Sequence, residues 1–99
     1  MNKYRDKSDF EINKAVAEKH GYHWYWSNTV GKPPIMVNGY IFDPCNNPSD
    51  AMPIIIENKI AINPKGDTWQ CGSGWNVAEN KNPLRTCMEV FLMTKDAEN

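Results

Sequence analysis

The strongest constraint on the fold is an apolar stripe near the end of the chain. Five apolar residues recur there at intervals of three and four positions: Leu84, Cys87, Met88, Phe91 and Leu92. This spacing places side chains on one face of an α-helix. Asn82 can cap the helix, and Pro83 suits its first position because no N–H is needed there. Such a helix is stable mainly through packing, so the rest of the chain must cover its apolar face.

Two other segments carry helix signals. A first helix is predicted from Ser8 to about residue 20, because Ser8 and Glu11 have the spacing of a capping box and Gly21 can end the helix in the left-handed conformation. Its apolar face is thin, so it needs a sheet beside it. A second helix is predicted from near Pro48 to Asn58, where proline again stands at a helix start.

Short strands are predicted between the helices. Asn38-Gly39 is the strongest signal, because these residues readily adopt the positive φ angles of a two-residue hairpin turn. Strands are predicted at 22–26, 35–37, 40–42, 59–63 and 68–71, and loops at 29–34, 64–67 and 72–74. The sequence therefore predicts an α+β fold in which about three helices pack on a small, mainly antiparallel sheet containing the hairpin at Asn38-Gly39.

Composition predicts a single globular domain over residues 1–99, with frayed ends at 1–7 and 95–99. A chain of 99 residues that is 40% hydrophobic can bury roughly 65% of its unfolded surface without covalent staples. The formal net charge is -1, and the two signs are interspersed. This disfavours duplex binding, which needs a clustered basic face, and imitation of DNA, which needs a strongly acidic one.

The sequence also predicts a cytoplasmic protein. No run approaches the roughly 18 consecutive apolar residues of a membrane span, and the positively charged start lacks the apolar region of a secretory signal. Cys45, Cys71 and Cys87 are odd in number and far apart, as expected of reduced thiols. At least one of them cannot be in an intramolecular disulfide, and the fold is expected to need none.

Three blocks of the sequence carry a family resemblance. They are residues 8–17, which begin Ser-Asp-Phe-Glu-Ile-Asn, the block 43–60, and residues 82–92, which begin Asn-Pro-Leu-Arg. Together they resemble the NinX-like proteins, small accessory proteins of lambdoid phages. The chain departs from that pattern at Met52, where a larger aromatic residue is expected, and at Glu89, where an apolar residue is expected. Its segment 62–82 is short for the family. The resemblance implies a phage origin and action in the host cytoplasm, but no particular activity.

Residues that could perform catalysis or hold a metal do not form a convincing set. His20 and His23 form an H-x-x-H pair, but Gly21 ends the helix between them and no third ligand stands nearby. The run 71–75 resembles a local motif of papain-like proteases, yet Gly74 occupies the position of the nucleophile, so a glycine-rich loop is favoured. We expect no metal, no cofactor and no enzymatic activity.

The turn that leads into the second helix is predicted to be structural. Its polar and small residues are Asp43, Cys45, Asn46, Asn47 and Asp50. Asp43 suits a turn that its own side chain stabilises, and Asp50 suits the start of the helix. The alternative is that Asp43, Asp50 and Glu57 supply paired carboxylates for acid-base catalysis, which needs two of them to face one pocket.

The aromatic residues are the best candidate for a binding surface. In a strand, Trp24 and Trp26 point to one face and Tyr25 to the other, so both faces carry large side chains. We predict that part of the set Trp24, Tyr25, Trp26, Trp69 and Trp75 is exposed as one patch, as in interface anchors. The alternative is that Trp24 and Trp26 fill the core, with Tyr25 half-exposed.

These observations leave three classes of function. A non-enzymatic interaction module that binds a host or phage protein fits the small size and neutral charge. A single-strand nucleic-acid binder could stack bases on the aromatic strand, but it needs basic residues there, and only Lys19 and Lys32 are close in sequence. A small enzyme is the third class, and no motif favours it.

Overall fold

The computed structural model of this chain describes residues 2–26 and 34–98. In this part of the chain it contains α1 (Asp9–His20), α2 (Pro48–Glu57) and α3 (Pro83–Ala97). Two antiparallel sheets accompany them: β1 (Trp24–Trp26), β2 (Ile35–Val37) and β3 (Tyr40–Ile41) form the first, and β4 (Ile62–Lys65), β5 (Thr68–Ser73) and β6 (Asn76–Asn80) form the second. The α+β class is confirmed, with two small sheets in place of one. The loop predicted at 29–34 lies outside the described residues except for Pro34.

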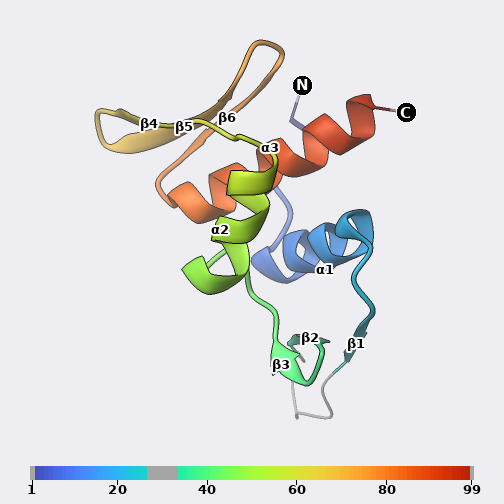
Figure 1. Cartoon of the computed structure of the whole chain (residues 1–99). Coiled ribbons are helices and arrows are strands. Elements are labelled where there is room, and N and C mark those ends of the chain that lie inside the picture. Colours follow the sequence, from blue (N-terminus) through green and yellow to red (C-terminus); the bar gives the residue numbers. More distant parts are fainter. Residues whose placement is uncertain (1, 27–33, 99) are drawn as a thin grey trace.

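The helix α3 is the centre of the fold. The second sheet packs on one side of it, and α1 and α2 pack on the other (Figure 1). As a result, every residue from 85 to 92 is buried, which is more than the stripe of Leu84 to Leu92 predicted. A helix covered on several sides buries polar positions as well as apolar ones, and those polar groups need internal partners.

The predicted helix ends are confirmed. The Ser8 hydroxyl accepts from the Glu11 N–H at 3.1 Å, and Gly21 ends α1 with φ 87°. Asn82 accepts from the N–H groups of Leu84 and Arg85 at the start of α3. These bonds satisfy N–H groups that the helices cannot bond internally.

The hairpin predicted at Asn38-Gly39 is also confirmed. Both residues have positive φ, 53° and 84°, as a type I′ turn requires, and β2 pairs with β3 across it. The strand predicted at 22–26 is shorter in the structure, where β1 begins at Trp24. β1 pairs with the other side of β2, so β2 is the central strand of the first sheet.

The second sheet differs most from the prediction. The strand expected at 59–63 lies at Ile62–Lys65. The break expected at 72–74 is only a tight turn, because β5 continues to Ser73 and β6 begins at Asn76. Gly72 lies within β5 with φ 89°, and an added Cβ there would meet Val90 of α3 at 3.0 Å. The glycine therefore permits close packing of the sheet on α3.

Segments near the two ends of the described chain contact each other. Tyr4, in the segment predicted to fray at 1–7, is 6% exposed, and its hydroxyl donates a hydrogen bond to Asp96. Asp96 lies in the last turns of α3, which continues to Ala97 within the segment predicted to fray at 95–99. Burial raises the pKa of Tyr4 to about 12, and the bond to Asp96 contributes. The bond between Tyr4 and Asp96 joins segments that are far apart in the sequence.

Candidate functional site

One face of β1 is directed towards α1. The Trp26 ring stacks on Phe10, with centroids 5.0 Å apart, and the Lys14 ammonium lies 5.4 Å from the centroid of Trp24. The two tryptophans also contact each other edge to face at 5.3 Å. These contacts on α1 are of the kind that the core alternative predicted, although Trp26 remains 45% exposed.

The other face of the first sheet carries a row of apolar side chains, which we call the outward row. Tyr25 pairs with Met36, and Met36 pairs with Ile41, so one residue of each strand lies in the same row. Alternation along a strand places this row on the face opposite Trp24 and Trp26. Tyr25 is 49% exposed and Ile41 is 57% exposed. The row is therefore an apolar surface in contact with solvent.

Two hollows adjoin Ile41. One, of about 220 Å³, has Phe10, Ile35 and Phe42 among its lining residues. The other, of about 290 Å³, is lined by Tyr22, Val37, Asn38, Tyr40, Ile41, Phe42, Ser49 and Asp50. The first also includes Asp9 and Asp43, so both hollows combine an apolar wall with carboxylates. An apolar side chain of a partner could enter either one.

The predicted aromatic patch is divided between two places. Trp24, Tyr25 and Trp26 belong to the first sheet, whereas Trp69 lies in β5 and Trp75 lies in the turn between β5 and β6. The two sheets stand at opposite ends of the molecule (Figure 1). Trp75 is 99% exposed and adjoins a separate hollow near the chain ends. The five residues therefore do not form one surface.

The turn from Asp43 to Asp50 is closed by its own hydrogen bonds. The Asp43 N–H donates to the Asp50 carboxylate at 2.9 Å, and the Asn47 amide oxygen accepts from the Ser49 N–H at 3.0 Å. Asn47 is thus the N-cap of α2. The Asp50 carboxylate therefore bonds the backbone of the turn, and the Asp43 carboxylate accepts from the amides of Asn13 and Asn46.

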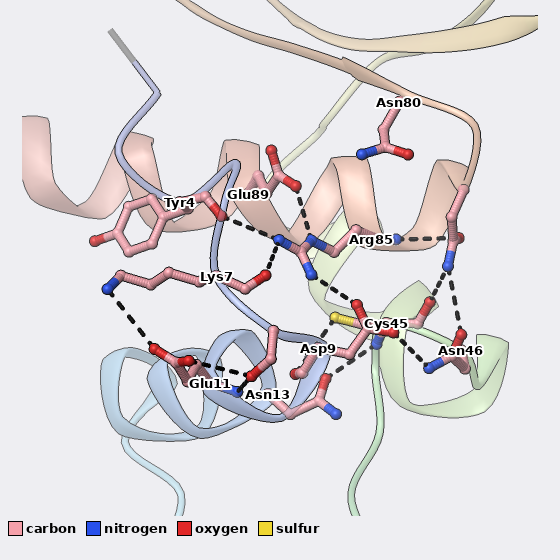
Figure 2. Close-up of polar contacts among 12 residues, drawn as sticks. Tyr4, Lys7, Asp9, Glu11, Asn13, Cys45, Asn46, Asn80, Arg85 and Glu89 are labelled. Atoms are coloured by element: carbon pink, nitrogen blue, oxygen red, sulfur yellow. Dashed lines mark hydrogen bonds and ion pairs between the residues drawn. The ribbon is translucent and has the colours of Figure 1, made fainter.

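The same turn is tied to α1 and α3. The Cys45 N–H donates to Asn13 at 3.2 Å, and its carbonyl accepts from Asn82 at 2.7 Å. The Asn46 amide donates to Asp9 and to Asp43, as Figure 2 shows for the Asp9 side of the turn. Cys45 is buried, and burial raises the pKa of its thiol above its ordinary range. We infer that this block joins the three helices.

Replacing Asn47 with alanine should lower the free energy of unfolding by about 1 kcal/mol, because the first turn of α2 loses its cap. Thermal or urea unfolding measures the change. Asn63→Ala, at an exposed position of β4, is the matched control and should have little effect. An unchanged melting temperature together with lost partner binding would instead make this turn a functional surface.

A buried arginine that the sequence interpretation missed organises the region shown in Figure 2. Arg85 is 7% exposed, and its guanidinium bonds Asp9 and Glu89, each at 2.7 Å. It also donates to the backbone carbonyls of Tyr4, Arg5 and Lys7. The sequence signal for it was the i,i+4 spacing of Arg85 and Glu89 on α3, at the position where an apolar residue was expected.

The electrostatics of this cluster favour a structural role. Burial alone would lower the pKa of Arg85, but the hydrogen bonds with Glu89 and Asp9 outweigh it and raise that pKa. Glu89 is fully buried, and its second oxygen accepts from Asn2 at 2.6 Å. The two charges therefore compensate each other and hold the N-terminal segment on α3.

The two candidate metal ligands, His20 and His23, do not come together with other ligands in the described residues. His20 ends α1 and faces Glu57 at 3.7 Å, while His23 lies exposed beyond Gly21. Among the side chains that the structure describes, no three from His, Cys, Asp and Glu come together to hold a metal. None of the helices in this part of the chain is long and apolar enough to cross a bilayer.

Comparison with known proteins identifies the family. The model described as Bacteriophage P22, NinX matches residues 3–95. The chain belongs to this NinX family. No curated protein and no solved structure matches the sequence. The NinX match covers α1, the turn at Asp43, both sheets and nearly all of α3, which agrees with the three blocks that carried the resemblance.

Proposed function

We propose that this member of the NinX family is a non-enzymatic interaction module that binds a host or phage protein in the host cytoplasm. The observation that carries the proposal is the outward row of the first sheet, Tyr25, Met36 and Ile41, which exposes apolar side chains to solvent. Aromatic and aliphatic anchors at the centre of a patch contribute much of the affinity of protein interfaces. The hollows beside Ile41 can accept an anchor from the partner.

The charges around this surface favour a protein partner over a nucleic acid. Asp43 and Asp50 lie in the two hollows, and carboxylates repel a phosphate backbone. Binding of a single strand would need cations that release counterions when they meet phosphates. Lys14 of α1 lies over the Trp24 ring. Its ammonium group is therefore on the face of the first sheet opposite the outward row.

The partner can be found by affinity capture from infected and uninfected host lysates, followed by binding measurements with the purified partner. Tyr25→Ala and Ile41→Ser should each weaken binding by roughly 30-fold or more and leave the melting temperature nearly unchanged. Trp75→Ala is the matched control, because Trp75 is also exposed but lies in the turn of the second sheet. It should bind normally.

Three results would contradict the proposal. Loss of binding in Trp75→Ala but not in Tyr25→Ala would move the site to the second sheet. Normal binding by all three variants would show that none of these apolar side chains anchors the partner. Tight binding to single-stranded oligonucleotides with a steep dependence on salt concentration would favour the nucleic-acid alternative.

A further inference from the structure

Two of the three cysteines meet in the core. Cys71 lies in β5 and Cys87 lies in α3, sixteen positions later, and their sulfur atoms are 3.1 Å apart. Both side chains are fully buried, at the contact between the second sheet and the central helix. The Cys71 sulfur also lies 3.7 Å from the carbonyl of Pro83. The sequence suggested scattered, unrelated thiols, whereas the fold makes a neighbouring pair.

We propose that Cys71 and Cys87 are an oxidisable pair, which hydrogen peroxide converts to a disulfide that joins β5 to α3. The Cys71 thiol releases its proton, and the thiolate attacks one oxygen of peroxide. The O–O bond breaks, the sulfur becomes a sulfenic acid, and the hydroxide that leaves takes up the released proton as one water. The Cys87 sulfur then attacks the oxidised sulfur, the S–S bond forms, and the hydroxyl group leaves as a second water with the Cys87 proton. The two thiols lose two electrons, which the peroxide takes up.

The environment of the pair distinguishes the roles of the two sulfurs. The hydrogen bond from Cys87 lowers the pKa of Cys71 despite its burial, which favours the thiolate that reacts with oxidants. The same bond, with burial, raises the pKa of Cys87. The sulfur–sulfur contact of 3.1 Å places each thiol within reach of a sulfenic acid formed on the other, and the lowered pKa favours Cys71 as the thiol that attacks first.

The geometry requires only a small movement. A disulfide bond is about 2 Å long, so the sulfurs must approach by roughly 1 Å. The oxidant must reach a buried site, and peroxide is small enough to enter when the second sheet separates briefly from α3. Cys45 is 0% exposed, its sulfur faces the backbone carbonyl of Asp9 at 3.8 Å, and no other cysteine of the described residues bonds to it. Oxidation should therefore select the pair.

The test is to treat the purified full chain with hydrogen peroxide and compare intact mass, peptide maps without reductant, and the melting temperature. We expect loss of two hydrogen atoms, a linked peptide containing Cys71 and Cys87, and one free thiol at Cys45. The melting temperature should rise by several degrees, because the closed loop restricts the unfolded chain. Dithiothreitol should restore both the mass and the melting temperature.

Two variants separate the proposal from its alternatives. Cys45→Ala should form the same disulfide, and Cys71→Ala should form none. If Cys71→Ala fails to fold, Cys87→Ala provides the same comparison. Three free thiols after treatment, a link that involves Cys45, or addition of oxygen atoms without a link would each overturn the proposal. These outcomes do not depend on partner binding.

Discussion

Replacing Arg85 with methionine should lower the free energy of unfolding by about 3 to 5 kcal/mol. The change leaves Glu89 fully buried without its charged partner at 2.7 Å. It also leaves the backbone carbonyls of the N-terminal segment without the donor that holds them on α3. Urea unfolding followed by circular dichroism measures the loss, and the segment 2–7 should exchange its amide hydrogens faster.

Two further variants identify the cause of that loss. Arg5→Met removes an exposed guanidinium and should change stability by less than about 0.5 kcal/mol. The double variant Arg85→Met with Glu89→Leu removes both charges and should recover much of the stability, because no unpaired charge stays buried. A double variant less stable than Arg85→Met alone would show that the charge of Glu89 is not the source of the cost.

Replacing Gly72 with alanine should cost about 3 kcal/mol or more. The φ angle of 89° is strained for any other residue, and the added Cβ would lie 2.1 Å from the backbone oxygen of Asn76. That atom belongs to the start of β6, so relief requires β5 and β6 to shift relative to each other or to α3. The melting temperature and the chemical shifts of the second sheet would report the change.

Gly74→Ala is the matched control for this prediction. Gly74 also has positive φ, 64°, but an added Cβ would meet nothing within 4 Å. It should therefore cost only the conformational strain, about 1 to 2 kcal/mol. Equal losses in the two variants would mean that strain, and not the contact with Asn76, sets the cost at Gly72.

The second sheet illustrates how local signals can mislead. Gly72 and Gly74 suggested the end of a strand, because glycine weakens strands and favours turns. In the structure β5 continues through Gly72 and turns only at Gly74 and Trp75. The reason lies in two close contacts: a Cβ on Gly72 would meet the backbone oxygen of Asn76 at the start of β6 at 2.1 Å and Val90 of α3 at 3.0 Å.

The aromatic residues show a similar limit. Alternation along β1 correctly separates Tyr25 from Trp24 and Trp26, because that separation depends on adjacent residues. Whether Trp69 and Trp75 join them depends on where the second sheet lies, and it lies at the other end of the molecule (Figure 1). The sequence does not show that Tyr25, Met36 and Ile41 share one row, because that depends on the register of the three strands.

The three helices, their caps, the hairpin at Asn38-Gly39 and the family could all be predicted from the sequence, because they depend on residues a few positions apart. The contact of Cys71 with Cys87, the bond of Arg85 to Asp9 across 76 positions, and the set of apolar residues that share a surface became visible only in the folded structure. Such contacts follow from how the elements pack around α3. The apolar pattern specifies that a helix face is buried, but it does not specify the elements that cover it.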